Sequence, residues 1–238
     1  MNIAIIFAGG TGTRIHNKSK PKQFLEINGK PIIIQTLEVF DETDEIDRII
    51  VVCLGGWIDY LQKLIKKNNV RKVAAIIEGG STGFESRLKG LMYAKENYSE
   101  NDIILLHDGV RPLVYRETII DNISTVKKYG AAVTVSPATE SLVMCDGDIA
   151  TTMTDRKKCF LARAPQSFYL KDVYDLYQRA KKDGNTSIPD TASMYLYYGK
   201  KLATVIGPME NIKITTSTDF YVLKALLDER ENNQAQGL

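Results

Sequence analysis

A glycine-rich segment with basic residues beside it, FAGGTGTRIHNKSKPKQF at positions 7–24, offers the first pattern with chemical meaning. It follows an apolar run and sets a backbone that can approach a planar base or phosphates closely beside the cations Arg14 and Lys22. It is not a dinucleotide fingerprint, since Ile15 stands where the third glycine is required, and no Gly-Lys-Ser/Thr closes it as a Walker loop. The segment predicts a nucleotide- or phosphate-binding loop; the alternative is a strand-to-helix turn with solvated lysines.

Three further polar clusters follow later apolar runs. The segment 78–86, EGGSTGFES, contains a second glycine pair, and 107–112, HDGVRP, places Asp108 and Arg111 after the next run. Asp108 suits a divalent cation or a ribose hydroxyl and Arg111 suits a phosphate, the alternative being a salt bridge within the loop. Lys213 lies in the apolar run NIKIT, where a lysine either extends outward or pairs with an anion. Together the clusters predict one anion-binding site.

The elements that must position these side chains are short β-branched-rich runs alternating with amphipathic stretches. This pattern predicts an α/β fold with a mostly parallel sheet covered on both faces by helices. Ligands bind outside the carboxyl ends of strands in such sheets, which is where the polar clusters lie. Strands are expected at 2–8, 48–54, 72–77, 102–107, 131–136, 202–206 and 211–215. Helices are expected at 31–42, 57–68, 84–97, 115–129, 170–182, 190–198 and 218–230.

Residues 137–165 interrupt this alternation. They alternate polar and apolar side chains around a turn at Asp146-Gly147, which predicts a hairpin or protruding β-arm. The expected organisation is a single domain over 1–238 that carries this arm.

Composition limits the function classes. The chain of 238 residues has a formal net charge of only +2, so nothing global indicates nucleic acid or an anionic membrane as a partner. No apolar run approaches the roughly 20 residues of a membrane-spanning helix, and the start lacks a signal-peptide layout, so a cytoplasmic protein is expected. The three cysteines show no metal-ligand spacing. His107 is expected to pack or hydrogen-bond at a strand end rather than to act in catalysis.

Six motifs carry a family resemblance. AGGTGTR…PKQF, GGS…S, HDGVRP, DR…APQSF, DTAS and NIKITT occur in this order from residue 3 to about 230. The chain resembles the nucleotidyltransferases similar to 4-diphosphocytidyl-2-C-methyl-D-erythritol synthase and ribitol-5-phosphate cytidylyltransferase. The resemblance implies a Rossmann-like fold and an enzyme that uses CTP with Mg²⁺, joins CMP to a sugar or polyol phosphate and releases pyrophosphate.

For the nucleotide, the resemblance implies that the first glycine-rich loop wraps the base and the phosphates of CTP. Cations stabilise the triphosphate and the developing pentacoordinate phosphorus, and a later lysine lies beside the α-phosphate. A second loop completes the cytosine and ribose site. The loop residues are Ala8, Gly9, Gly10 and Gly12, the catalytic cations are Arg14, Lys22 and Lys213, and the second loop contributes Gly80, Ser81 and Ser86.

For the acceptor, the resemblance implies that Asp108 and Arg111 lie beside the reacting phosphates, with Asp108 also a ligand of Mg²⁺. Ser141 and Arg156, on the 137–165 arm, would meet the second phosphate. In the family this arm crosses to a partner subunit, so a homodimer with shared sites is expected. A free hairpin is poorly stable alone, which agrees with such an exchange.

Three smaller features of the sequence favour one acceptor. The spacing from Arg14 to Lys22, Val110 in HDGVRP and Trp57 after the second strand favour ribitol 5-phosphate, and hence a precursor for teichoic acid or capsule. The chain departs from the family pattern at Gly83, where arginine is usual and neighbouring Arg87 is a substitute. It also departs at Ala164 and Ser141, where threonine is usual.

Alternatives remain open from the sequence. They are 2-C-methyl-D-erythritol 4-phosphate or another polyol phosphate as the acceptor, a nucleotide-sugar pyrophosphorylase that uses UTP or GTP, and a nucleotide-binding module without turnover.

Overall fold

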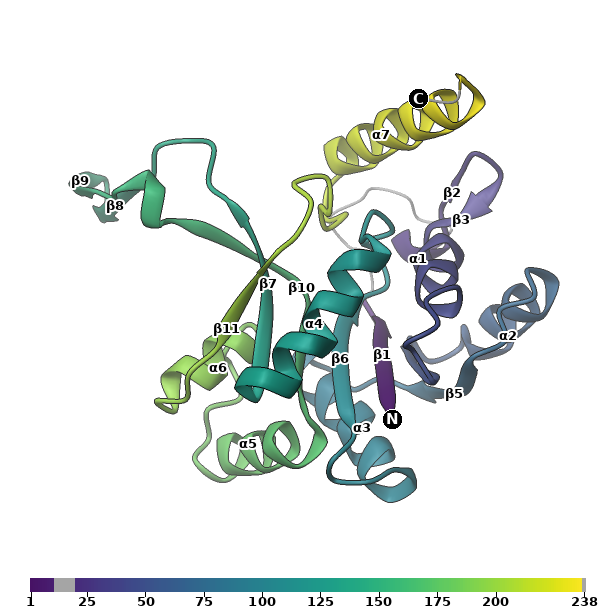
Figure 1. Ribbon diagram of the computed structural model, residues 1–238, viewed down its shortest axis with the longest axis horizontal. Coiled ribbons are helices and arrows are strands. Elements are labelled where there is room, and N and C mark those ends of the chain that lie inside the picture. Colours follow the sequence, from purple (N-terminus) through teal and green to yellow (C-terminus); the bar gives the residue numbers. More distant parts are fainter. Residues whose placement is uncertain (11–19, 237–238) are drawn as a thin grey trace.

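The computed structural model describes residues 1–10 and 20–236 (Figure 1). Within them, a seven-stranded sheet has the order β11-β7-β10-β6-β1-β4-β5. Every pairing in it is parallel except those of β10, which runs antiparallel to β6 and β7. Its strands are β1 (Asn2–Ala8), β4 (Arg48–Cys53), β5 (Val73–Glu78), β6 (Ile103–Asp108), β7 (Ala131–Pro137), β10 (Phe160–Tyr169) and β11 (Ala203–Ile206).

Helices cover both faces of the sheet, except the last one, which packs in a separate apolar cluster. They are α1 (Ile32–Asp41), α2 (Ile58–Lys67), α3 (Gly83–Asn97), α4 (Arg116–Tyr129), α5 (Leu170–Lys182), α6 (Thr191–Tyr197) and α7 (Ser217–Gln236). Each predicted helix is present within a few residues of its expected ends, α7 being the longest extension. The predicted α/β class is therefore confirmed. No helix in the described part of the chain is long and apolar enough to cross a membrane.

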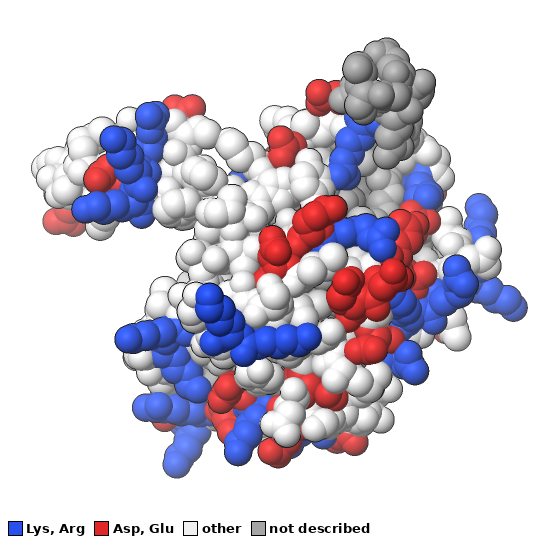
Figure 2. Space-filling view, in the orientation of Figure 1, with Lys and Arg blue, Asp and Glu red and all other residues white. Residues whose placement is uncertain are grey.

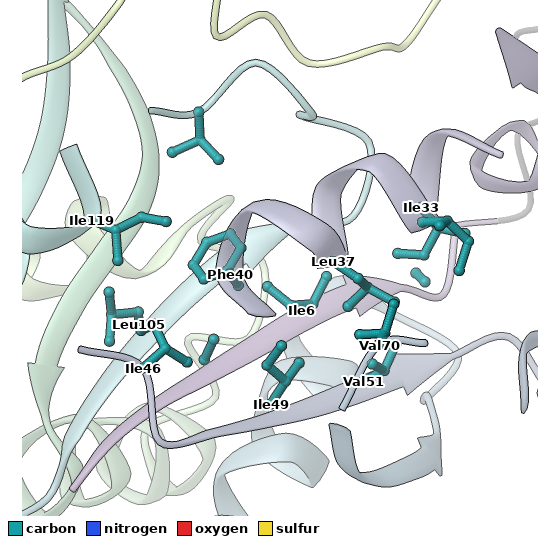
Figure 3. Packing of buried hydrophobic residues seen from close by; sticks show 14 of the residues in the cluster. Ile6, Ile33, Leu37, Phe40, Ile46, Ile49, Val51, Val70, Leu105 and Ile119 are labelled. Atoms are coloured by element: carbon teal, nitrogen blue, oxygen red, sulfur yellow. The ribbon is translucent and has the colours of Figure 1, made fainter. Parts of the chain in front are cut away.

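The hydrophobic core has two layers because successive side chains of a strand point to opposite faces. On β1, Ala4 and Ile6 face the layer formed with α1, α2 and α4, while Ile3 and Ile5 face the layer formed with α3, α5 and α6. Figure 3 shows residues of α1 lying over Ile6 in the first layer. Strands buried on both faces explain the continuous apolar runs seen in the sequence.

Smaller elements lie at the edges of the sheet. A short helical turn precedes a small hairpin near the chain start, and a second hairpin with its own helical turn forms the predicted arm. These elements are η1 (Lys22–Phe24), β2 (Glu26–Ile27), β3 (Lys30–Pro31), β8 (Val143–Asp146), β9 (Ile149–Met153) and η2 (Arg156–Lys158). Gly147, with a φ of 57°, occupies the turn of the arm as predicted, and Figure 1 shows the arm extending away from the sheet.

Two predicted boundaries are wrong. Residues 160–165 do not belong to the arm alone, because β10 begins at Phe160 and pairs with Pro137 of β7. The run 211–215 forms no strand. Its alternating apolar side chains pack instead into the cluster beneath α7, where Ile214 is fully buried, and the Ile214 amide donates to the Val110 carbonyl. The apolar residues Ile212 and Ile214 are two positions apart, so this loop reproduces the sequence period of a strand.

Gly90 allows α3 to approach the sheet closely. A Cβ at this position would lie 2.9 Å from Cγ2 of Ile5 and 3.1 Å from Cγ2 of Val52. Both neighbours are fully buried and β-branched, so neither methyl group has room to move. The close packing of α3 in the second layer of the core therefore requires a glycine at position 90.

We predict that Gly90→Val lowers the free energy of unfolding by about 2 kcal/mol, because overpacking outweighs the gain in helix propensity. Urea unfolding followed by circular dichroism measures the change. Glu96→Val, at an exposed position of the same helix, is the matched control and should leave the unfolding midpoint nearly unchanged. Equal midpoints for the two variants would contradict the close packing of α3.

Candidate active site

The predicted glycine-rich loops converge at the carboxyl ends of β1 and β5. A cavity of about 340 Å³ opens between them, and part of its wall is the N-terminus of α3 at Thr82 and Gly83. Amide groups at a helix N-terminus favour anions such as phosphate. Of the predicted site residues, the lining includes Ala8, Gly9, Gly10, Lys22, Gly80, Ser81, Ser86, Asp108 and Lys213.

The described start of the first loop is bonded to Gln23, a buried residue on η1. Its Nε2 donates to the carbonyl of Ala8 at 2.6 Å and to that of Gly10 at 3.2 Å. The neighbouring Lys22 Nζ donates to the carbonyl of Ile214 at 2.7 Å. This places the Lys22 cation at the cavity wall, across from the second glycine loop.

The turn η1 is anchored by aromatic packing. Phe24 stacks on Trp57 with ring centroids 4.9 Å apart, and Tyr60 contacts both rings edge-on. Trp57 therefore packs against the loop that carries Lys22, and it lines neither of the two cavities near the strand ends. Its effect on the site acts through the position of η1.

The second loop is locked by the first turn of α3. The Gly80 amide donates to Ser86 Oγ at 3.0 Å, and Ser81 donates through its amide and hydroxyl to Glu85. These bonds from Ser81 hold the pKa of the Glu85 carboxyl below its usual value. A Cβ on Gly80 would lie 2.3 Å from Cβ of Glu85, so only glycine fits.

Asp108 at the end of β6 is shared by two cations. Its Oδ1 accepts from Lys213 Nζ at 2.7 Å and its Oδ2 from Arg111 Nε at 2.8 Å. Arg111 is buried, and its Nη1 also donates to the Asn211 carbonyl at 2.7 Å. Burial opposes ionisation of Asp108, but Lys213 and Arg111 outweigh it and hold the pKa of this carboxyl well below its usual range. Lys213 thus has the anionic partner that its sequence context suggested.

His107 supports this loop from the core. It is buried, its ring lies 4.9 Å from that of Phe40, and its Nε2 lies 3.1 Å from the Arg111 carbonyl. Burial lowers the pKa of His107 to about 4, so the ring is neutral near pH 7 and donates to that carbonyl. The prediction that His107 packs at a strand end is confirmed.

A second cavity of about 260 Å³ adjoins the first. The two share Phe7, Arg87, Asp108 and Lys213, and the second is additionally lined by Arg111 and other residues near β10. Two anionic ligands, one in each cavity, would meet at Asp108 and Lys213. This is the geometry needed to bring a nucleotide and an acceptor together.

Some predicted residues are not at these cavities. Gly12 and Arg14 lie outside the described residues. Ser141 and Arg156 lie exposed on the arm, where Arg156 Nη1 donates to the Thr139 carbonyl, and neither is in the described lining of these two cavities. Figure 2 shows basic side chains gathered on the arm, to which the turn η2 contributes.

Sequence reasoning missed several residues that build the site. Gln23 lies within the PKQF motif, but nothing in its spacing indicates that its amide spans two loop carbonyls. Asn211 donates to the Ala164 carbonyl at 2.7 Å, and Arg163 lines the second cavity. Arg163 stands directly before APQSF, which is the only sequence signal for it.

The fold and the site together define a nucleotidyltransferase. A family model described as "IspD: 2-C-methyl-D-erythritol 4-phosphate cytidylyltransferase" matches residues 2–229, and the chain belongs to this family of cytidylyltransferases. The resemblance inferred from the six motifs is confirmed.

Relatives extend this result over the whole chain. The chain is 48% identical over 238 residues to ribitol-5-phosphate cytidylyltransferase of Vibrio parahaemolyticus serotype O3:K6, covering 100% of each. It is 46% identical over 239 residues to the protein of the same name from Streptococcus agalactiae serotype Ia, again covering 100% of each. The crystal structure of 4-diphosphocytidyl-2C-methyl-D-erythritol synthase from Anaerococcus prevotii superposes with a TM-score of 0.82 at 25% identity, covering 95% of each chain.

We predict that Asp108→Asn lowers the free energy of unfolding at pH 7 by about 2 kcal/mol, because Arg111 is left buried without its countercharge. The pKa of Asp108 is lower in the folded chain than its ordinary value of 3.8, so its stabilisation is present above that value. The difference between wild type and variant should therefore shrink as the pH falls below about 4.

Urea unfolding between pH 3 and pH 7 measures both effects. Glu100→Gln is the control, because it removes a carboxylate from an exposed pair with Lys95 and should change stability much less. A variant as stable as wild type at pH 7 would contradict the role of Asp108 as countercharge.

Proposed function

We propose that this cytidylyltransferase transfers CMP from CTP to ribitol 5-phosphate, giving CDP-ribitol and pyrophosphate for teichoic acid or capsule synthesis. The observation that carries the proposal is the 46–48% identity over full length to proteins named ribitol-5-phosphate cytidylyltransferase. Similarity to proteins named for the methylerythritol substrate is lower: 36% over 223 residues for a relative from Thermosipho melanesiensis and 25% for the superposed structure, besides the match to the family model. These proteins supply the alternative acceptor, 2-C-methyl-D-erythritol 4-phosphate.

In this reaction a phosphate oxygen of the acceptor attacks the α-phosphorus of CTP. The bond between the α-phosphorus and the oxygen bridging to the β-phosphate breaks, and pyrophosphate leaves with the electron pair. No side-chain nucleophile is required, so positioning and charge neutralisation supply the catalysis. The cavities are suited to this, since CTP in the first places its phosphates beside Lys22 and Lys213, and an acceptor in the second approaches Arg111 and Asp108.

The loop residues take the roles that the family implies. The backbone of residues 8–10, with Gly12, wraps the base and phosphates, and Gly80, Ser81 and Ser86 complete the cytosine and ribose site. Arg14 acts with Lys22 on the triphosphate, although its position lies outside the described residues.

A divalent cation fits this site as a companion of the nucleotide. Within the described residues, no group of three or more His, Cys, Asp or Glu side chains could hold a metal ion. Asp108 is the one carboxylate in the described lining of the first cavity. Mg²⁺ would therefore take most of its oxygen ligands from the triphosphate, with Asp108 as the protein ligand, and would neutralise phosphate charge.

Pyrophosphate release in the presence of Mg²⁺ tests the proposal. We expect turnover with CTP and ribitol 5-phosphate at least tenfold faster than with UTP, GTP or ATP, or with 2-C-methyl-D-erythritol 4-phosphate, glycerol phosphate, arabinitol phosphate or mannitol phosphate. Lys22→Ala is the inactive control and Lys30→Ala, in a half-buried pair with Glu38 that lines neither cavity, is the active one. Preferred turnover of the methylerythritol substrate would overturn the ribitol assignment, and no turnover with any pair would favour a binding module.

We further propose that the enzyme is a homodimer in which the arm of each chain completes the site of its partner. The arm exposes apolar side chains, including Val143, Met144, Ile149 and Met153, that a partner would cover. It also carries Ser141 and Arg156, which lie away from the cavities of their own chain. An exchanged arm would bring the Arg156 guanidinium to the acceptor phosphate of the partner.

A mixing experiment tests the shared site. Arg156→Ala and Lys22→Ala chains should each be nearly inactive alone. Co-refolding them in equal amounts should restore about a quarter of wild-type activity, since half the dimers are mixed and one of their two sites is intact. If mixed dimers form and no activity returns, Arg156 serves its own chain.

A further inference from the structure

The second cavity holds more positive than negative charge. Its described lining includes Arg87, Arg111, Arg163 and Lys213 against two carboxylates. Asp108 is already shared by Arg111 and Lys213. The other carboxylate, Asp190, caps α6 by accepting from the amide and the hydroxyl of Ser193. The described lining of the second cavity therefore carries more positive charge than its two carboxylates neutralise.

Arg87 and Arg163 are the lining cations without a carboxylate partner among the described residues. They differ in how much of each guanidinium is already bound. Arg87 uses Nε for the Tyr177 hydroxyl at 2.7 Å and Nη2 for the Pro189 carbonyl at 3.0 Å, and it lines both cavities. Arg87 is thus tied into the wall between the two cavities.

Arg163 is held by one contact and lines only the second cavity. Its Nε donates at 3.0 Å to Oγ of Ser136, a fully buried residue of β7. Within the described residues no other hydrogen bond engages its guanidinium, so both terminal nitrogens remain for a ligand. Arg163 also lies where the register of β10 against β7 shifts, between Ala162 and Gln166.

The surroundings of Arg163 are unfavourable for a cation in the absence of an anion. Partial burial and the neighbouring Arg111 both lower the pKa of Arg163. Arg111 and Arg163 line the same cavity, and only Arg111 is paired with a carboxylate, that of Asp108, which Lys213 shares. The two guanidinium groups are therefore suited to bind an oxyanion with two negative charges. A phosphate monoester has this charge near neutral pH and can accept from both forks.

We propose that Arg163 binds the phosphate of the acceptor substrate from within the same chain, together with Arg111. The inference rests on the proposed function, because it assigns the second cavity to the acceptor. Arg163 contributes a bidentate contact to one edge of the phosphate, which leaves another phosphate oxygen directed to the side shared with the first cavity, where Asp108 and Lys213 lie. Contact with the phosphate makes Arg163 a determinant of affinity for the acceptor. Affinity for the nucleotide is determined by the glycine loops instead.

Steady-state kinetics of Arg163→Gln and Arg163→Lys test this assignment. We expect Arg163→Gln to raise the KM for ribitol 5-phosphate at least tenfold and to leave the KM for CTP within twofold. Arg163→Lys keeps the charge but loses the fork, so its increase should be smaller. Arg48→Gln is the matched control, since Arg48 is exposed at the opposite end of the sheet and, among the described residues, its side chain bonds only to the adjacent Asp47 carbonyl.

Failure of the proposed function is separable from failure of this inference. If wild type uses another polyol phosphate, the same comparison of KM values is made with that acceptor. If it uses none, calorimetric titration with inorganic phosphate is compared between wild type and Arg163→Gln, and tenfold weaker binding by the variant supports the assignment. If Arg163→Gln does not fold, the increase in the acceptor KM is compared with the increase in the CTP KM for Arg163→Lys instead. An unchanged acceptor KM, equal increases in both KM values, or unchanged phosphate binding overturns it.

Discussion

The parallel pairing of β1 between β4 and β6 positions the loops that line both cavities. The Leu54 amide after β4 donates to the Ala8 carbonyl, and the Gly109 amide after β6 donates to the Phe7 carbonyl. Gln23 donates to the same Ala8 carbonyl from the other side. The end of one buried strand thus sets the positions of three loops. Burial of β1 on both faces keeps this end fixed without help from the loops.

Charge balance then determines what the site can bind. Asp108 is the countercharge for Lys213, which lines both cavities, and for Arg111, which lines the second. With its one carboxylate already shared, the described wall there attracts anions rather than isolated metal ions. In the proposed reaction, a metal carried by the nucleotide would add positive charge where the two phosphates approach each other.

Most helices and parallel strands could be predicted because their apolar periodicity reports burial directly. β10 escaped this reasoning although it is a central strand. Its polar side chains are paired with other elements: Gln166 accepts from the Ala192 amide, Ser167 donates to Asn122, and Arg163 donates to Ser136. A strand whose polar groups are satisfied by distant partners does not read as an apolar run. The opposite error occurred at 211–215, which was predicted to be a strand because its apolar residues alternate, although it forms a loop.

The family, the order of most elements and the glycine loops beside the first cavity could all be inferred from the sequence. These features are local, since a glycine is required wherever a side chain would collide, as at Gly80. Only the tertiary structure decided that Lys213 pairs with Asp108 across 105 residues, and that Arg163 faces a cavity while Arg156 lies on an arm away from it. Long-range partners, burial and net charge in a cavity arise from packing, and no local pattern encodes them.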